Sequence, residues 1–457
     1  MLTILSTVSA SVMLDYRMRG SASDIDTGAS PKEFGRLDYV RITIFGLAMT
    51  ALWSSLHSII LPLRIADFVP VGRQATYLGL LTVTGLLLAI ATQPIAGAFS
   101  DRSGLRWGRR RPFILIGAIA TLSFLPGIGL AGRLSILFAI YYLLQISANT
   151  ALGPYLAFIP DLVPQEKRGR VSGVKGLLEI AGAGVAIWLI GNLMGNYSTG
   201  VGGWWLWLSL GILAALFLST MIATVVTVKE KPGAGVARLP SLSTLAKTFS
   251  TDVKARLYKS FRIDVKANPD FIRFVLSRLF FIIPLTAFQA FGLYFFRDYL
   301  GVANPSAVMG NFTLVSSLCM VGMVYPAGFL SDRFGRKPIG LASGLIAALG
   351  IGLLFFFRSY EFIRLAAILM GIGFGGLWAS NWALAIDVVP KDEAGKYIGL
   401  TNLASAGGSA LARLQGPMID FFNRPRFGLG LGYTAMLSTS LASLIASSAL
   451  LWRIKKR

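Results

Sequence analysis

The chain has 457 residues, of which 54% are hydrophobic and only 14% are charged, whereas soluble domains carry about 25% charged residues. This composition excludes an ordinary soluble protein and indicates an integral membrane protein. The net charge is +22, but the basic residues are dispersed along the chain and do not lie beside base-stacking aromatics, so we expect no nucleic-acid partner.

Residues 1–39 contain a short apolar run, Met1 to Leu14, followed by a polar stretch rich in serine, aspartate and glycine. The run is shorter than the about 20 residues that a helix needs to cross a bilayer, and no basic region precedes it as in a signal peptide. We therefore expect a disordered cytoplasmic leader. The alternative is a translation start assigned too early, with a later methionine as the true start.

Twelve apolar runs follow, each long enough to cross a bilayer once as a helix. They cover residues 41–63, 75–99, 112–130, 135–160, 171–193, 204–228, 271–296, 305–330, 338–357, 362–386, 397–419 and 429–452. The chain is therefore predicted to be an all-α integral membrane protein with twelve transmembrane helices. We expect one six-helix half over 40–228, a cytoplasmic linker over 229–270, a second six-helix half over 271–453, and a basic cytoplasmic tail over 454–457.

Two pairs of matching segments indicate that the halves are homologous. The loop after the second run opens Gly97-Ala-Phe-Ser-Asp-Arg and ends on basic residues and a proline, and the loop that begins at Gly328 after the eighth run repeats this pattern. Asp161-Leu-Val-Pro likewise matches Asp387-Val-Val-Pro, with two later glycines at the same spacing. Long internal repeats of apolar sequence are typical of secondary transporters.

The distribution of lysine and arginine predicts the orientation in the membrane, because positive loops stay cytoplasmic. The short loops on the side of the Gly97 loop carry thirteen basic residues, and the loops on the other side carry eight. The linker and both terminal segments add further basic residues to the first side. We therefore expect both termini in the cytoplasm and the chain in the plasma (inner) membrane.

With these loops the chain resembles the major facilitator superfamily, whose Gly-x-x-x-Asp-Arg-x-Gly-Arg-Arg/Lys loop follows span 2 and recurs after span 8. The resemblance covers about residues 40–453. Four shorter segments are similar to the sucrose/proton symporters and related glycoside transporters: Gln93-Pro94, Gly108-Arg-Arg-Arg-Pro-Phe113, Gly153-Pro154 and Asp161-Leu162. Two charged positions of that group are absent, since Gln145 and Leu156 stand in their places.

The resemblance implies that the loop carboxylates and guanidinium groups form a cytoplasmic gate, which pairs neighbouring spans in one conformation and releases them in another. The alternative is that the arginines only orient the chain and contact lipid headgroups. The residues of this predicted gate motif are Gly97, Asp101, Arg102, Arg109, Arg110, Asp161, Asp332, Arg333, Arg336 and Asp387.

Polar residues inside the runs are the candidates for substrate binding or coupling, because polar groups at lipid depth usually face the bundle interior or a water-filled cavity. Glu179 is the one acidic residue placed well inside a run, and Lys175 lies one helical turn before it on the same face. The other candidates are His57, Gln145, Asn149, Gln289, Asn381 and Arg413.

Each candidate has a structural alternative. Isolated Gln and Asn residues, including Gln93, often serve only to hydrogen-bond helices together. His57, the one histidine, is either a proton carrier or a helix contact. Trp53, Trp378 and Trp382 either stack on a sugar ring or pack in the core.

The sequence predicts a secondary active transporter that moves a small solute by alternating access, with a sugar or glycoside as the leading substrate class and protons as the coupling ion. The alternatives are a proton-antiport exporter of amphipathic compounds and a non-transporting sensor or assembly factor. An enzyme is not expected, because the sequence has no usable Ser-His-Asp set and no phosphate-binding Gly-x-x-x-x-Gly-Lys. Cys319 is the single cysteine and His57 the single histidine, which cannot build a typical metal site, so we expect no metal and no other cofactor. The expected partners are a small-molecule substrate, protons and membrane lipids, and the chain is expected to be monomeric.

Overall fold

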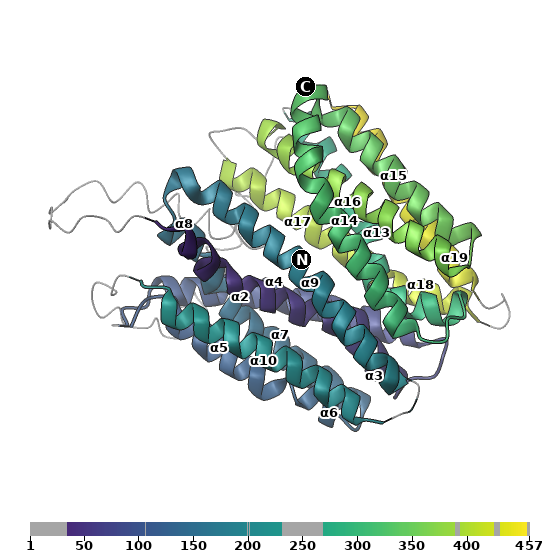
Figure 1. The fold of residues 1–457 in the computed structure, drawn as a ribbon, viewed down its shortest axis with the longest axis horizontal. Coiled ribbons are helices and arrows are strands. Elements are labelled where there is room, and N and C mark those ends of the chain that lie inside the picture. The colour runs from purple at the N-terminus through teal and green to yellow at the C-terminus, as the bar shows by residue number, and fades with distance from the viewer. Residues whose placement is uncertain are drawn as a thin grey trace, which may run out of the picture.

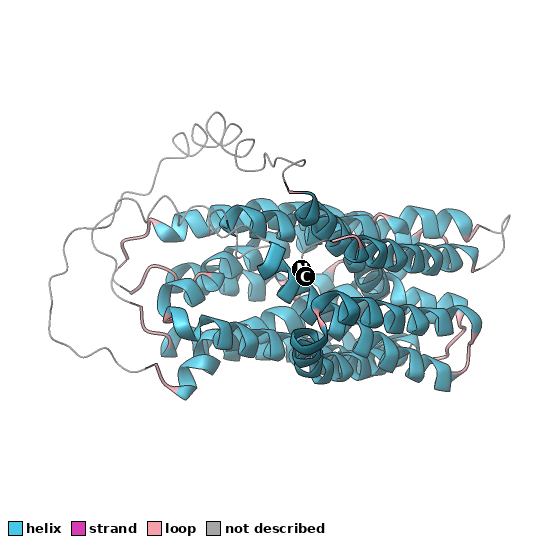
Figure 2. Ribbon diagram, turned by 90° about the horizontal axis from the view of Figure 1, so that it is seen from above, coloured by secondary structure: helices cyan, strands magenta, loops and turns pink. Residues whose placement is uncertain are grey.

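The computed structural model describes residues 34–105, 107–198, 200, 202–230, 268–388, 394–424 and 430–454. Most of the predicted leader, linker and tail lies outside these residues. The described part consists of helices and connecting loops and contains no strand (Figure 2). The apolar runs form helices because a bilayer offers the backbone no partners, and a helix satisfies its own N–H and C=O groups.

The first half begins with α2 (Arg36–Ser55), which continues through the π-helical turn η1 (Leu56–Ile60) into α3 (Leu61–Ala66). These three elements form one span. The remaining elements of this half are α4 (Gln74–Asp101), α5 (Arg111–Phe124), α6 (Gly127–Leu130), α7 (Leu134–Leu156), α8 (Phe158–Leu162), η2 (Gln165–Lys167), α9 (Arg168–Ser198) and α10 (Trp204–Thr227).

The second half begins with α13 (Pro269–Tyr294), which ends in a second π-helical turn, η4 (Phe295–Tyr299). It continues with α14 (Pro305–Phe334), α15 (Arg336–Phe356), α16 (Tyr360–Val388), α17 (Ala394–Arg413), α18 (Gln415–Phe422) and α19 (Leu431–Trp452). Proline stands in the first turn of α5, α13 and α14, where its missing N–H breaks no helical hydrogen bond.

Eleven helical segments of the described residues are long and apolar enough to cross a membrane. The predicted run 397–419 is the one without such a segment. In its place the structure has α17 and α18, which meet at Leu414. The two helices together occupy the place of the predicted eleventh span, with one residue between them, as α7 and α8 do in the fourth. Glycine, serine and asparagine lower the hydropathy of α17, and the carbonyl oxygen of its last residue, Arg413, lies against Gly79 of α4.

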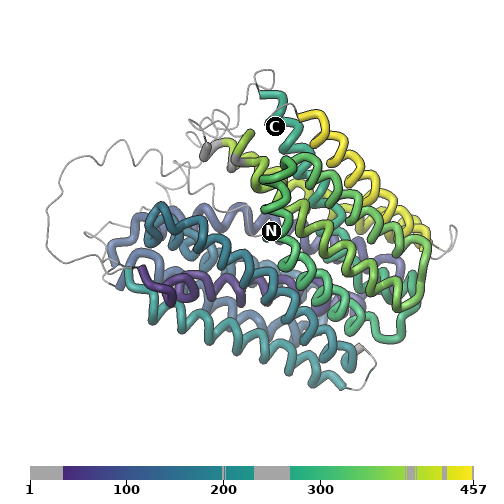
Figure 3. The backbone as a smooth tube through the Cα atoms, turned by 45° about the horizontal axis from the view of Figure 1, so that its top comes forward, coloured from purple at the N-terminus to yellow at the C-terminus, as the bar shows by residue number. Residues whose placement is uncertain are grey.

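The two halves form two groups of helices (Figures 1 and 3), with α2–α10 in purple to teal and α13–α19 in green to yellow. We call the end of the bundle that carries residues 102–110 the basic-loop side, and the other end the opposite side. The prediction of an all-α membrane fold in two homologous halves is confirmed.

Small residues join the halves where α9 crosses α14. A Cβ atom added to Gly184 would lie 2.6 Å from Ser317 Cβ, and one added to Gly191 would lie 2.5 Å from the carbonyl oxygen of Ser306. Only glycine therefore allows the backbones to approach this closely. This crossing extends from the middle of α9 to its end on the opposite side.

Candidate functional site

A hydrogen-bonded row of side chains lies in the interior of the first half, between η1 and α7. His57 Nε2 is 3.0 Å from the Tyr141 hydroxyl, which also accepts a hydrogen bond of 2.8 Å from Gln145 Nε2. Asn149 Nδ2 donates to the Gln145 backbone carbonyl and to Oε1, at 2.7 and 3.1 Å. The structure thus connects three predicted site residues, His57, Gln145 and Asn149, through Tyr141, which the sequence analysis missed.

Aromatic and basic groups surround His57. Trp53 stacks on the imidazole with ring centroids 5.3 Å apart, and it meets Tyr141 edge-on. Arg413, at the end of α17 in the second half, is buried and donates to the Ser409 carbonyl oxygen. The Arg413 carbonyl oxygen lies against Gly79 of α4, so this predicted residue is at a contact between the halves. The imidazole lies in a π-helical turn, an irregularity that is frequent at functional sites.

Lys175 and Glu179 form the predicted ion pair on α9, with 2.7 Å between Nζ and Oε1. The side chains are 12% and 9% exposed. A Cβ atom on Gly46 of α2 would lie 2.7 Å from Glu179 Oε1 and 2.8 Å from the Tyr155 hydroxyl, so the carboxylate packs directly against α2. Tyr155 accepts from the Gly46 N–H and donates to the Thr43 carbonyl oxygen.

A buried arginine, Arg278 of α13, lies in the second half and was missed by the sequence analysis. Its Nε donates to Ser405 Oγ at 2.8 Å, and its Nη1 donates to Asn381 Oδ1 at 2.5 Å. The indole rings of Trp382 and Trp378 lie 4.7 and 5.6 Å from the guanidinium carbon. Asn381, a predicted site residue, is buried, and its partner is a cation from another span.

The loop between α4 and α5 forms a compact ionic cluster with α8. Asp161 Oδ2 accepts from Arg109 Nη2 at 2.8 Å and from Arg110 Nη2 and Nε at 2.9 and 3.1 Å. Arg110 is buried and also pairs with Asp101, and its Nη1 donates weakly to the Gly97 carbonyl oxygen at 3.4 Å. Five residues of the predicted gate motif thus meet within one half.

Glu230 completes this cluster and was not predicted. Its carboxylate accepts from the backbone N–H groups of Arg110, at 2.9 and 3.1 Å, and of Arg111, at 3.3 Å. These groups open α5, where a helix presents free N–H groups and favours a negative charge. Gly108 has a φ of +119°, which turns the loop so that this carboxylate fits against it.

The second half repeats one ion pair of this cluster, between Arg336 and Asp387. The other two predicted residues, Asp332 and Arg333, are exposed, and Arg333 lies over the Phe334 ring at 5.4 Å. Arg102, in the first half, is also exposed. In each half, an arginine of the loop therefore pairs with an aspartate at the end of a later span, the fourth in the first half and the tenth in the second. The sequence repeat does not bring Asp332 into such a cluster.

A polar network on the opposite side joins the halves, and sequence analysis did not identify it. Arg297 Nη2 donates to Gln74 Oε1 at 2.5 Å, and the Tyr294 hydroxyl donates to the Pro62 carbonyl oxygen at 2.8 Å. The Asp420 carboxylate accepts from the backbone N–H groups of Thr76 at 2.6 Å and of Ala75 at 3.4 Å. These bonds hold the opposite side closed.

Two interior amides stay outside these groups. Gln289 of α13 is half-buried and makes no hydrogen bond to a residue that the structure describes. Gln93 of α4 is buried, and its side-chain nitrogen and oxygen have no hydrogen-bond partner within the described residues. The prediction that Gln289 belongs with the other polar residues has no support from this geometry.

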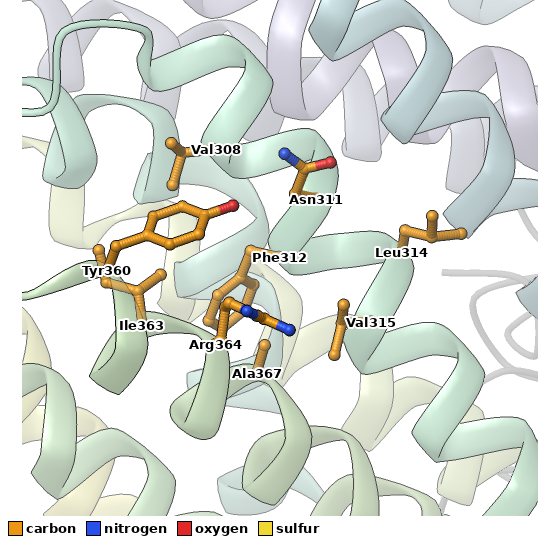
Figure 4. Close-up of a pocket in the computed structure, with 9 residues that line it drawn as sticks. All are labelled: Val308, Asn311, Phe312, Leu314, Val315, Tyr360, Ile363, Arg364 and Ala367. Carbon is orange, nitrogen blue, oxygen red and sulfur yellow. The ribbon is translucent and has the colours of Figure 1, made fainter.

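A cavity of about 280 Å³ lies between α14 and α16 on the opposite side (Figure 4). Its lining is mostly apolar, with Asn311 and Arg364 as polar members and Tyr360 at one edge. No predicted site residue lines it, so it is separate from the groups described above.

Comparison with known proteins gives the following similarities. A family model described as Major Facilitator Superfamily matches residues 40–412. The sucrose transport protein SUT1 of Oryza sativa subsp. japonica is 27% identical over 199 residues, which cover 35% of each chain. The multi-drug resistance efflux pump PmrA of Streptococcus pneumoniae is 30% identical over 136 residues, 29% of this chain and 33% of that protein. The chain thus matches about a third of the length of these relatives.

The crystal structure of a D-xylose-proton symporter matches with a TM-score of 0.65 at 17% identity, covering 91% of this chain and 97% of that chain. At this identity the similarity describes the fold alone.

Proposed function

This chain belongs to the Major Facilitator Superfamily, and from that premise we propose that it carries a small solute across the membrane by alternating access between its two halves. It is a multi-pass integral membrane protein and not an enzyme. The observation that carries the proposal is the one-sided closure. Hydrogen bonds that Arg297 and Tyr294 donate and that Asp420 accepts join the halves on the opposite side. Among the described residues of the basic-loop side, the ion pairs of Arg110 and Arg336 stay within each half.

We further propose that the basic-loop side is cytoplasmic. The excess of lysine and arginine in its loops supports this orientation. In that case the structure is closed toward the outside, and the solute would exchange with the cytoplasm. Release of the opposite-side hydrogen bonds would be the step that exposes the interior polar residues, including Gln145 and Glu179, to the outside.

A sugar or glycoside is the leading substrate class in this proposal. The identity to a sucrose transport protein supports it, as do the interior groups, because sugars are bound by hydrogen-bonding side chains together with aromatic faces. Gln145, Asn149 and Tyr141 supply hydrogen bonds in the first half, and Trp53 lies beside them.

Protons are the proposed coupling ion, with Glu179 as the group that binds them. Glu179 is buried on α9, with Lys175 Nζ 2.7 Å from its Oε1. Movement of the halves would alter the separation and hydration of this pair, and the carboxylate would take up a proton on one side of the membrane and release it on the other. His57 is the next candidate, since it is titratable and hydrogen-bonded to Tyr141.

Uptake into proteoliposomes tests the proposal. The purified full chain would be reconstituted and given a panel of radiolabelled sugars, with and without an imposed pH gradient. We expect accumulation of at least one sugar that depends on the gradient. Uptake that only equilibrates would contradict the coupling, and no uptake of any solute would favour a non-transporting sensor or assembly factor.

An exporter of amphipathic compounds is the second candidate, and the identity to the efflux pump PmrA favours it. The same vesicles distinguish the two. An exporter would move a lipophilic dye against the direction of proton flow and ignore the sugars, whereas the proposed symporter would move a sugar with the protons.

A further inference from the structure

Arg278 is a fully buried cation that has no acidic partner among the residues that the structure describes. Its exposed fraction is 0%, and its two bonded acceptors, Asn381 Oδ1 and Ser405 Oγ, are both neutral. The third nitrogen, Nη2, has no hydrogen-bond partner among the residues that the structure describes. A guanidinium group stays protonated in proteins and offers five N–H donors, so this group has both an uncompensated charge and free donors.

Such an arrangement is costly unless something balances it. Buried charges are normally paired, because removing an ion from water costs several kcal/mol that only an opposite charge and further hydrogen bonds offset. The indole faces of Trp382 and Trp378 attract the cation, but an aromatic face carries no negative charge. A negative charge that balanced the guanidinium would lie next to Nη2, because this nitrogen has no hydrogen-bond partner within the described residues.

The internal repeat allows the surroundings of Arg278 to be compared with the corresponding residues of the first half. Asp161 and Asp387 correspond in the two halves, 226 positions apart. The same spacing relates Tyr155 to Asn381 and Glu179 to Ser405. The second half therefore has a serine where the first half has its one interior carboxylate.

The residues that these two pairs contact differ between the halves. Tyr155 and Glu179 both contact Gly46 of α2, and Asn381 and Ser405 both contact Arg278 of α13. The second half therefore has a buried cation against its pair, and no residue that the structure describes supplies an acid to it. A carboxylate from outside the chain would fill that role.

We propose that Arg278, Asn381 and Ser405 bind a carboxylate group of the transported solute, so that the substrate is a small organic acid anion such as a sugar acid. This inference rests on the proposed transport function and specifies its substrate. A carboxylate oxygen on Nη2 would complete the hydrogen bonds of the guanidinium and neutralise it. Trp378 and Trp382 are partly exposed and cover the cation, so one indole ring must move aside to admit the ligand and would then pack on its apolar body.

Pairs of solutes that differ only in the carboxylate test this site. Glucuronate against glucose, galacturonate against galactose, and gluconate against glucitol would be compared on the purified full chain by tryptophan fluorescence and by uptake into proteoliposomes. We expect at least one acid to bind about 10- to 100-fold more tightly than its neutral partner, the range for hydrogen bonds to a charged group. Equal binding of acids and neutral analogues, or saturation of the effect by chloride alone, would overturn the proposal.

Two substitutions locate the effect at Arg278. Arg278→Gln should remove the preference for the acid, while the control Arg133→Gln, which removes an exposed arginine on the opposite side, should keep it. Asn381→Asp would supply an internal carboxylate and should raise the melting temperature while abolishing binding of the acid. If Arg278→Gln unfolds the chain, the Asn381→Asp variant tests the proposal by itself. A purely structural role of Arg278 predicts that Asn381→Asp still binds the acid more tightly than its neutral analogue.

The results also separate this inference from the transport function. Uptake of a neutral sugar that is unaffected by Asn381→Asp would leave the proposed transport intact and overturn the carboxylate site. Absence of uptake for every acid and neutral solute would contradict both.

Discussion

Glu179 is the single residue on which the proposed coupling depends. Its carboxylate is buried, lies 2.7 Å from Lys175 Nζ and packs against Gly46. We predict that Glu179→Gln folds, binds solute and exchanges it, but loses accumulation in response to a pH gradient, because an amide cannot carry the proton. Glu166→Gln, which changes an exposed acid, is the control and should accumulate normally.

The alternative is that the pair only fixes α9 to α2. Breaking a buried pair by removing one partner costs roughly 3–5 kcal/mol, so Glu179→Gln would then lower the melting temperature strongly. If a well-folded Glu179→Gln variant still accumulates solute, another residue must carry the proton, and His57 would be tested next.

Asp161 is the acceptor at the centre of the basic-loop cluster, and its removal should matter more for stability than that of Asp101. Asp161 accepts from both Arg109 and Arg110. Among the described residues, Asp101, with a side chain 36% exposed, pairs with Arg110 only. We predict that Asp161→Asn costs roughly 1–3 kcal/mol of stability and that Asp101→Asn costs less, measured as melting temperatures in detergent.

Transport kinetics check the gating role of the same cluster. We expect Asp101→Asn to slow turnover more than it weakens solute binding, because the ion pair would stabilise one conformation of the loop. Unchanged turnover in both variants would reduce these residues to determinants of topology.

The contacts that sequence analysis could identify were those between residues one helical turn apart. Lys175 and Glu179, like Gln145 and Asn149, are one helical turn apart, so the spacing itself predicts contact. Arg278 could not be identified in this way. It lies near the start of a predicted span, where arginine usually reaches lipid headgroups, and its partners are on two other spans.

The crossing of α9 with α14 brings the backbones of the two halves into close contact at Gly184 and Gly191. We predict that Gly191→Leu weakens the closed opposite side, because its side chain would meet the Ser306 carbonyl oxygen. Spin labels at Arg133 and Ala303, both exposed, should then show a longer or broader distance distribution than in the unsubstituted chain.

Gly173→Leu is the matched control, because it lies on the same helix with nothing within 4 Å of an added Cβ. It should leave the distances unchanged. An unaltered distribution in Gly191→Leu would mean that α9 and α14 do not determine the closed state.

The apolar runs predict the number and position of the spans, because a bilayer requires about 20 residues per span. They do not predict two irregularities within the helices. The π-helical turn at His57 adds one residue to a helical turn without any glycine or proline in it. The break at Leu414 arises where α17 approaches α4, with the Arg413 carbonyl oxygen against Gly79, which is a contact between distant segments.

At the scale of the whole molecule, the proposed orientation can be tested with two single cysteines in a Cys319→Ser background. Lys229→Cys is exposed on the basic-loop side, and Ala303→Cys is exposed on the opposite side. We predict that a membrane-impermeant maleimide applied to intact cells labels Ala303→Cys only. Labelling of Lys229→Cys alone would invert the proposed topology, and both should be labelled after the cells are opened.

The two-half architecture could be predicted because the loops repeat, but the closed side could not. The network of Arg297, Gln74 and Asp420 draws on residues far apart in the sequence, and none of them belongs to the repeated motifs. The proposed transport cycle requires at least two arrangements of the halves, so we expect no sequence pattern to select the one that the structure adopts.

Asp420 accepts from the Thr76 and Ala75 amides in the first turn of α4, so the second half caps a helix of the first. In the proposed transport cycle this cap would exist only while the opposite side is closed. On opening, these amides would meet water, and their protons would become free to exchange with deuterium. The protection of this one turn against exchange would therefore measure the fraction of time that the molecule spends closed, without any label attached to it.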